Sequence, residues 1–132
     1  MIHSSPLLRC ALLADAVFSG VSAVAMVLDT STLASLLGLP DALLRETGLF
    51  LIAYTALVGW LGARTSLPKG PVILVVAGNA AWTLASIALL LSGAVSPNLL
   101  GTIVILAQAI ATGVFAELQY VGLRRSEGAV TA

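Results

Sequence analysis

Four long apolar stretches dominate this sequence of 132 residues. They run from about residue 7 to 28, 48 to 63, 71 to 91 and 99 to 122. A helix needs about 20 apolar residues to cross the ~30 Å hydrocarbon core of a bilayer. Strands are excluded for these stretches, because an open sheet leaves unpaired backbone groups in lipid. The predicted fold class is all-α: residues 1–132 form a single transmembrane domain, a polytopic bundle of four transmembrane helices.

The composition also favours a lipid environment. Hydrophobic residues make up 59% of the chain and charged residues 9%, and the mean hydropathy is +1.08. A soluble domain has about 25% charged residues, and a small one leaves much of its surface in water. Six basic and six acidic residues cancel, so no basic patch indicates nucleic acid. The bilayer is the expected partner, and nucleic acid is excluded.

One cysteine, Cys10, and one histidine, His3, exclude several kinds of chemistry. No intramolecular disulfide can form, so a dithiol redox enzyme is excluded. Haem held by two histidines and a multi-histidine metal site are excluded as well. We therefore expect no cofactor and no metal, and we interpret Cys10 as a small apolar residue that fills space near one membrane face.

The connection after the first stretch is the longest of the three. Its residues 31–37 place leucines on one face of a short helix, and Gly38 is suited to end that helix. We predict an interfacial helix that lies on the membrane. Pro40 and Asp41 look like the start of a new helix, so the second transmembrane helix has an alternative start there.

The distribution of cations predicts the orientation. With the N-terminus inside, only Arg45 lies in an external segment, and the cytoplasmic segments hold five cations: Arg9, Arg64, Lys69, Arg124 and Arg125. Positive charge is enriched on the cytoplasmic side of membrane proteins. We expect a multi-pass protein of the bacterial inner membrane with both termini in the cytoplasm.

A cleaved signal peptide is the competing interpretation of the first stretch. Arg9 precedes an apolar run, and Ala23-Val24-Ala25 resembles a cleavage site. Asp15 lies in the middle of that run and argues against cleavage, because a signal peptide has an uncharged apolar segment there.

An internal repeat supports the first stretch as part of the fold. Asp15-Ala16-Val17-Phe18-Ser19 in the first stretch is similar to Asn79-Ala80-Ala81-Trp82-Thr83 in the third, and a serine follows each. The second and fourth stretches end in aromatic-x-Gly-x-Arg, at Trp60–Arg64 and Tyr120–Arg124. We predict two parallel helical-hairpin repeats related by an axis along the membrane normal. The aromatic-x-Gly-x-Arg motif is explained equally well by anchoring of its aromatic and arginine side chains at the membrane interface.

Asp15 is the clearest ionisable residue inside an apolar stretch, where a charge costs roughly 2.5–3.5 kcal/mol on insertion scales. Polar residues on all four stretches are expected at a similar depth, because each would be penalised against lipid. The predicted intramembrane polar site consists of Asp15, Ser19, Tyr54, Asn79, Gln108 and Thr112. Two forms of Asp15 remain open: a neutral carboxyl group, or a carboxylate that accepts hydrogen bonds from Asn79 and from a tyrosine or serine. Ordinary interhelical hydrogen bonding, worth about 0.6 kcal/mol per bond, is the alternative role for the amides and hydroxyls.

Charges near the inner interface form a second expected group. Glu117 lies about one and a half turns before the end of the fourth stretch, and we expect it to pair with Arg9, Arg64 or Arg124.

Small residues recur at helical spacing on the third and fourth stretches. Such faces let helix backbones approach closely. They are Ala77, Ala81, Ala85 and Ala88 on the third, and Ala107, Ala109, Ala111 and Gly113 on the fourth. They pack inside the bundle, or against a second copy in a homodimer or another membrane protein.

The layout resembles small four-helix bacterial membrane proteins of the DoxX-like kind. The segments that carry the resemblance are Leu13–Gly20, Gly78–Trp82 and Ala116–Leu123. It implies helix number and spacing, but no activity. Small multidrug-resistance transporters also have four helices and an essential acid in the first helix, where Asp15 stands here. This chain departs from them in its long first connection, its extra charges and its lack of an aromatic box beside the acid.

The sequence favours a non-enzymatic membrane protein that acts as a subunit, assembly or helper module. The alternative is a small proton- or cation-coupled transporter that uses Asp15, with Ser19, Tyr54, Asn79 and Gln108 along its path; four helices are too few to enclose a path alone, so it requires an oligomer. A membrane enzyme or lipid-binding protein is the third hypothesis. Only Asp15 and Glu117 offer ionisable groups for catalysis, and no Ser-His pair, metal spacing or nucleotide loop is present.

Overall fold

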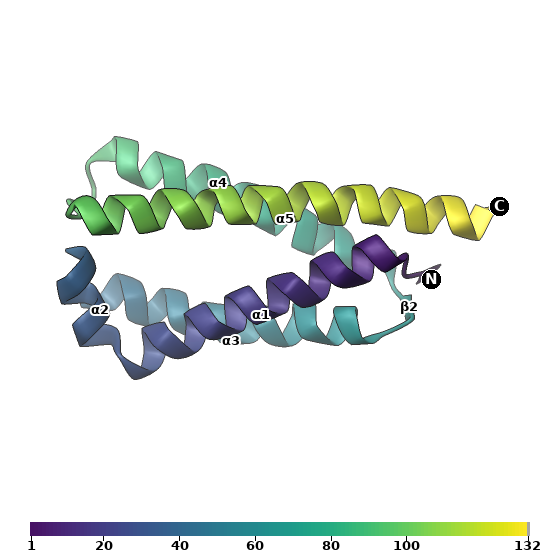
Figure 1. Ribbon diagram of the computed structural model, residues 1–132, viewed down its shortest axis with the longest axis horizontal. Helices are drawn as coiled ribbons and strands as arrows, with labels where there is room; N and C mark the ends of the chain where they lie inside the picture. The colour runs from purple at the N-terminus through teal and green to yellow at the C-terminus, as the bar shows by residue number, and fades with distance from the viewer. Residues whose placement is uncertain (132) are drawn as a thin grey trace.

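The computed structural model describes the backbone of residues 1–131 and the side chains of residues 1–127; Ala132 lies outside the described residues. It contains four long helices, one short helix and two very short strands (Figure 1). The elements are β1 (Ile2–His3), α1 (Pro6–Leu28), α2 (Thr30–Leu37), α3 (Asp41–Ala63), β2 (Ser66–Leu67), α4 (Lys69–Ser92) and α5 (Leu99–Thr131). Four helices are long and apolar enough to cross a membrane, and the predicted all-α membrane fold is confirmed.

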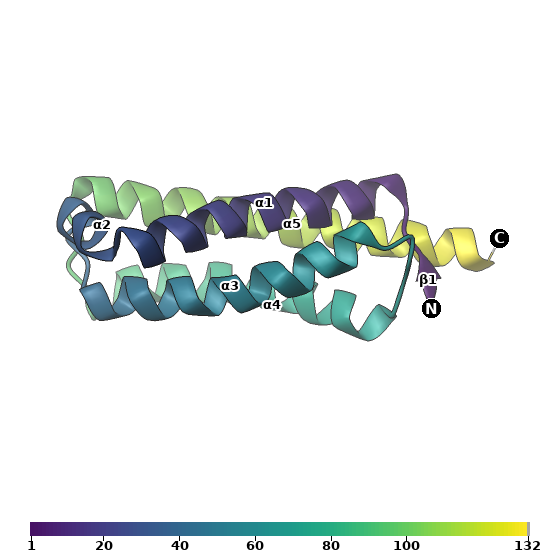
Figure 2. The same cartoon turned by 90° about the horizontal axis from the view of Figure 1, so that it is seen from below.

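The four long helices occupy the corners of an elongated bundle. Figure 1 shows α4 and α5 above α1 and α3, and the view turned by 90° shows α1 and α5 above α3 and α4 (Figure 2). Helix α1 packs along α3, α4 packs along α5, and α1 also contacts α5, whereas the backbones of α3 and α4 stay apart. The start of the chain and the last turn of α5 lie at one end of the bundle, which we call the termini end, and α2 lies at the opposite α2 end.

Local signals explain most helix boundaries. Ser5 caps α1: its Oγ accepts a hydrogen bond from the backbone N–H of Leu8 at 3.2 Å, and Pro6 occupies the first turn. Helix α2 ends at Gly38, which has a left-handed conformation with φ of 69°. Helix α3 begins at Asp41, the earlier of its two expected starts.

Helix α5 extends well beyond its expected end near residue 122 and reaches Thr131. The aromatic-x-Gly-x-Arg motif therefore lies inside the helix rather than at its end. No residue from 123 to 127 is a proline or glycine that would end a helix. Because α5 is longer than expected, residues nearer its C-terminal end lie beside the middle of the other helices.

Two apolar clusters lie at opposite ends of the bundle. The cluster at the termini end is the larger and consists of Ile2, Leu8, Leu12, Val58, Leu61, Leu67, Val72, Val75 and Leu123. The cluster at the α2 end consists of Ala34, Leu37, Leu39, Leu44 and Ile105. The polar residues predicted from the sequence lie along the bundle between them.

A two-residue antiparallel ladder, which the sequence analysis did not expect, closes the termini end. Strand β1 pairs with β2 in the register Ile2 to Leu67 and His3 to Ser66. It brings the buried side chains of Ile2 and Leu67 over the core at this end. The chain start is thereby attached to the connection between α3 and α4.

Candidate functional site: a buried carboxylate and an apolar cavity

One side chain from each long helix converges on the carboxylate of Asp15 in α1. Tyr54 Oη in α3 donates to Oδ2 at 2.7 Å, Asn79 Nδ2 in α4 at 2.9 Å, and Gln119 Nε2 in α5 at 2.8 Å. Ser19 Oγ, one turn along α1, donates to Oδ1 at 3.0 Å. We call these five residues the Asp15 cluster. It links all four long helices through one carboxylate.

The Asp15 cluster is shielded and internally satisfied. The exposed fraction is 0% for Asp15 and Gln119, 3% for Asn79 and 5% for Ser19. Four donors of the same chain surround the carboxyl group, three at Oδ2 and one at Oδ1. Asn79 Nδ2 also donates to Gln119 Oε1 at 2.9 Å, so the donors are connected to one another. The structure shows the hydrogen bonds expected from Asn79 and from a tyrosine and a serine to the carboxyl group of Asp15.

Close packing of helix backbones at the termini end makes this convergence possible. A Cβ atom on Gly122 of α5 would lie 2.6 Å from the backbone N and Cα atoms of Leu8 in α1. Ser5 reinforces this crossing, because its Oγ donates to the Gly122 carbonyl at 2.9 Å and its N–H donates to Ser126 Oγ at 2.9 Å. Glycine at this crossing lets α5 approach α1 closely enough for Gln119 to reach Asp15.

Gln119 belongs to the site and was not predicted from the sequence. Gln108 was expected close to the depth of Asp15, on a fourth helix that was expected to end near residue 122. The helix continues to Thr131, and Gln119 takes the position beside Asp15. Gln108 lies about 16 Å further toward the α2 end on the α-helical rise of about 1.5 Å per residue. The absence of a proline or glycine from residue 123 to 127 was the signal that α5 continues past Gly122.

Gln108 and Thr112 form two separate contacts between α4 and α5. Gln108 Oε1 accepts from Trp82 Nε1 at 2.8 Å, and its Nε2 donates to Ser86 Oγ at 2.9 Å. Thr112 Oγ1 lies 2.7 Å from Thr83 Oγ1. The structure therefore brings together four of the six predicted polar residues and assigns the other two to the seam between α4 and α5.

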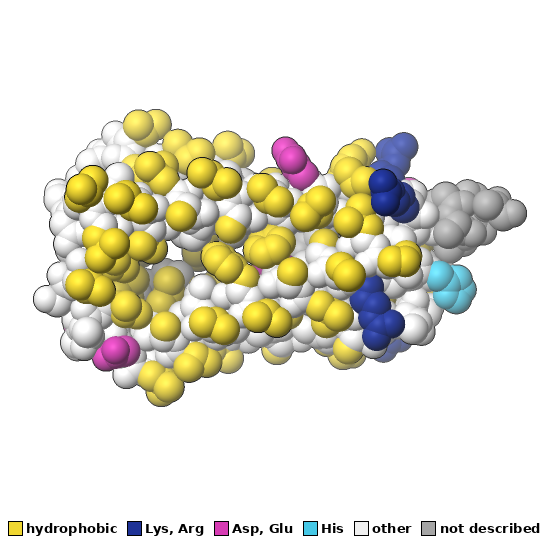
Figure 3. Space-filling view, viewed as in Figure 1, with side chains coloured by type: hydrophobic (Ala, Val, Ile, Leu, Met, Phe, Trp, Pro, Cys, Tyr) yellow, Lys and Arg dark blue, Asp and Glu magenta, His cyan; other side chains and the backbone are white. Residues whose placement is uncertain are grey.

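An apolar cavity of about 680 Å³ lies between the pair α1–α3 and the pair α4–α5. All four long helices line it, together with Leu37 at the end of α2 and Leu39. It extends from the Asp15 cluster, where Ser19, Tyr54 and Asn79 are part of its wall, toward the α2 end. The space-filling view shows the surface hollowed toward the α2 end (Figure 3).

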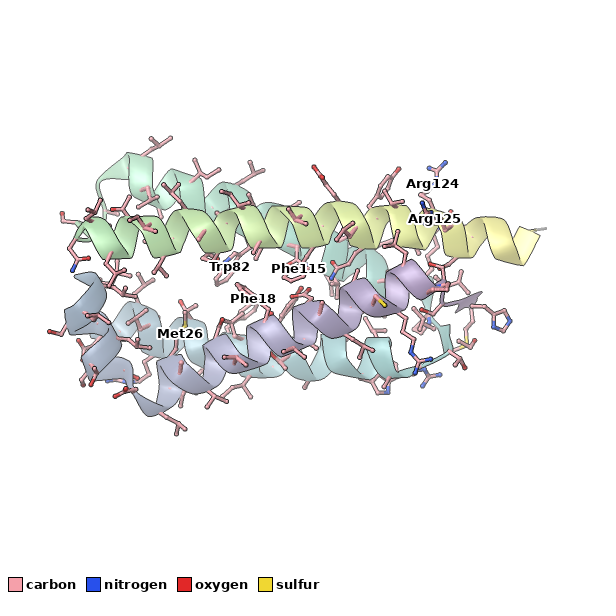
Figure 4. The ribbon with its side chains drawn as sticks, viewed as in Figure 1. Phe18, Met26, Trp82, Phe115, Arg124 and Arg125 are labelled. Atoms are coloured by element: carbon pink, nitrogen blue, oxygen red, sulfur yellow. The ribbon has the colours of Figure 1, made fainter. Side chains whose placement is uncertain are left out.

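Two aromatic pairs bridge the seams between the helix pairs. Phe18 of α1 meets Phe115 of α5 edge-on, with ring centroids 5.7 Å apart. Phe50 of α3 stacks on Trp82 of α4, with centroids 5.9 Å apart and an interplanar angle of 6°. Figure 4 shows Phe18, Trp82 and Phe115 in the space between the upper and lower helix pairs, with Met26 nearer the α2 end. These large rings hold the helix pairs apart, whereas Gly122 lets them meet.

The expected interface charges lie at the termini end but do not pair as predicted. Arg9, Glu117 and Arg124 are exposed. Among the described side chains, the only ion pair joins Lys69 and Glu127 at 2.6 Å. Arg64 and Arg124 instead lie over the aromatic rings four residues before them, with Cζ 4.7 Å and 6.0 Å from the ring centroids. Glu117 is exposed on α5, and no ion pair joins it to an arginine among the described side chains.

The two faces of small residues have different environments. On α5, Ala109 is buried and Gly113 lies near Thr83 of α4, so this pair packs inside the bundle, whereas Ala107 is exposed. The α4 face is exposed along its length, at Ala77, Ala81, Ala85 and Ala88. Helix α4 therefore presents an uncovered small-residue face on the outside of the bundle.

Within residues 1–127, no three His, Cys, Asp or Glu side chains gather where they could hold a metal ion. Comparisons of the sequence with protein families and curated proteins, and a comparison with solved structures, found no match.

Proposed function

We propose that this chain is a non-enzymatic integral membrane protein that acts as a subunit, assembly or helper module. The observation that carries the proposal is the burial of Asp15, which is 0% exposed and accepts hydrogen bonds from all four long helices. An acid that catalyses or carries an ion has to exchange its partners during turnover. Here both carboxyl oxygens already accept hydrogen bonds from buried side chains of the bundle, which supports a structural role that sets the mutual positions of the helices.

The outer face of α4 is the proposed partner surface. Among the long helices, α4 packs extensively only against α5, and its exposed alanines allow close approach of another helix. A second copy of the chain or a different membrane protein would fit this face. The bilayer is the proposed surrounding medium, and no role with nucleic acid is proposed.

The proposed location is the bacterial inner membrane, with both termini in the cytoplasm. Lysine and arginine side chains gather near the termini end on the face in Figure 3. Arg45, near the start of α3, lies toward the α2 end. This distribution supports the orientation by the positive-inside tendency of membrane proteins.

A proton- or cation-coupled transporter remains the second candidate, because the apolar cavity reaches three of the donors to Asp15: Ser19, Tyr54 and Asn79. Proteoliposomes that contain the purified chain separate the two functions. A structural role predicts proton and cation flux equal to that of empty liposomes, and lower stability of Asp15→Asn. Flux above the empty control that disappears in Asp15→Asn would contradict the module and support the transporter.

A further inference from the structure

The cavity walls are built from helix faces that would interlock in a closed bundle. In α3 the lining residues recur at helical spacing: Leu43, Thr47, Phe50, Tyr54 and Leu57. The facing stripe of α4 is Val75, Gly78, Trp82, Ala85 and Leu89. Side-chain ridges on such faces normally pack into one another at interaxial distances of 8–10 Å. Here the backbones of α3 and α4 stay apart; Phe50 stacks on Trp82 between them, and the two stripes border the cavity.

The volume of the cavity is large for a packing defect. Protein interiors are close-packed, and voids larger than a water molecule are few. The volume of about 680 Å³ lies within the roughly 300–1,000 Å³ typical of ligand sites. The cavity therefore has the size of a binding site.

Polar groups in the wall have few free hydrogen-bonding positions for an occupant. Ser19 and Tyr54 donate to Asp15, and Ser22 Oγ donates to the backbone carbonyl of Phe18 at 2.8 Å. Gln108 uses both its amide nitrogen and its oxygen within the protein. Apolar cavities of this kind stay dry and bind apolar molecules. The wall thus selects an occupant that needs no hydrogen bonds.

The cavity borders the surface that faces lipid. Two of its lining residues are also strongly exposed, Phe50 at 56% and Leu74 at 64%. Both lie within helices long and apolar enough to span a membrane, so the medium beside them is hydrocarbon. An apolar molecule dissolved in the bilayer can reach the cavity sideways without crossing water.

We propose that the cavity binds one hydrocarbon chain of a membrane amphiphile, seated between α3 and α4 with its end near Tyr54 and Asn79. The aromatic pair Phe50–Trp82 lies against the bound hydrocarbon chain on the α3–α4 side. This site is additional to the proposed module function and involves no flux, and of the exposed alanines of α4 it shares only Ala85.

Trp82 lies in the cavity wall and reports the occupant. Trp60 is the other tryptophan, and a Trp60→Phe background leaves Trp82 as the sole fluorophore. The full chain in detergent is titrated with stearic acid brominated in mid-chain, because bromine quenches tryptophan on contact. We expect quenching that saturates as one site fills. Quenching that rises in proportion to probe without saturation would overturn the site.

A matched pair of glycine variants tests the location. A Cβ atom on Gly78 or on Gly70 of α4 meets no atom within 4 Å, but only Gly78 lines the cavity. Gly78→Phe should lose the saturable quenching, and Gly70→Phe should keep it. Ala85→Phe fills the cavity two turns away and decides the result if Gly78→Phe does not fold. Unchanged saturable quenching in a folded cavity variant would overturn the proposal.

A second probe shows whether the bound hydrocarbon chain belongs to a phospholipid or to a single-chain amphiphile. Phosphatidylcholine with brominated acyl chains, added in place of the free acid, tests whether a phospholipid chain can enter. Saturable quenching by both probes identifies a phospholipid chain as a competent occupant, and quenching by the acid alone identifies a single-chain amphiphile. Quenching by neither probe would overturn the proposal.

Discussion

The two halves of the bundle differ in how their helices meet. At the termini end, the helices are packed so closely that the largest fully buried side chains all lie there, including Leu8, Leu12, Leu61, Asp15 and Gln119. Toward the α2 end, the two helix pairs separate around the apolar cavity. Both halves are built from similar apolar helices. Hydrophobicity alone therefore does not decide which half closes.

The residues at the crossings explain the difference. At the termini end, Gly122 brings the α5 backbone against Leu8, and Gly62 of α3 packs against Leu13 of α1. Toward the α2 end, the seams between the pairs are bridged by the rings of Phe18, Phe50, Trp82 and Phe115. In lipid, helix association depends on close van der Waals packing and on hydrogen bonds across helices. At the contacts between the pair α1–α3 and the pair α4–α5, Gly122 gives a closed half and the large rings give an open one.

The largest effect is expected when the closed half is forced open. Gly122→Leu places side-chain atoms where the Leu8 backbone lies and should destabilise the fold by about 3 kcal/mol, at the upper end for overpacking. Unfolding of the purified protein by added denaturing detergent, followed by circular dichroism, measures it. The control is Gly78→Ala, whose Cβ meets open space and which should be neutral or stabilising. Equal effects of the two substitutions would contradict the close crossing.

Removing the carboxylate should be nearly as damaging. Asp15→Ala leaves buried donors of Tyr54, Asn79 and Gln119 without their acceptor and should cost about 3 kcal/mol, as expected when one partner of a buried polar network is lost. The same unfolding assay measures it. Ser22→Ala is the control, because Ser22 Oγ bonds only within its own helix, and a change within about 0.5 kcal/mol is expected. A loss for Asp15→Ala as small as that of the control would show that the cluster contributes little.

A pair of glutamine substitutions compares the two halves directly. Gln119→Leu removes a fully buried donor to Asp15 and should cost about 1.5–2 kcal/mol, as for hydrogen bonds to charged groups. Gln108→Leu removes neutral contacts to Trp82 and Ser86 and should cost about 0.6 kcal/mol, the average for interhelical bonds in membranes. The reverse order of the two losses would contradict the assignment of Gln119 to the Asp15 cluster.

Much of the fold could be predicted because membrane helices are encoded locally. The apolar runs located all four long helices, and Gly38 was correctly expected to follow the short helix α2. The start of α3 at Asp41 was an alternative rather than the first choice, since Arg45 and Glu46 interrupt the apolar run.

The site was predictable only in part. Asp15, Ser19, Tyr54 and Asn79 could be brought together by counting depth from nearby helix ends, which were nearly correct. Gln119 could not, because the depth of residues in α5 depends on where α5 ends and on its crossing with Leu8. The cavity depends on angles between helices, which are set by contacts between distant residues and leave no local sequence signal.

Cysteine reactivity tests the contrast between a closed and an open half most directly. Cys10 is the only cysteine and is exposed, so Cys10→Ala provides a background for single substitutions. Leu12→Cys and Val58→Cys place thiols at positions of 0% exposure in the closed half, and Ser22→Cys and Gly78→Cys place them in the cavity wall. With a lipid-soluble maleimide on the folded protein, we predict labelling of the second pair and none of the first until the protein is denatured. Equal labelling rates for the two pairs would contradict the account.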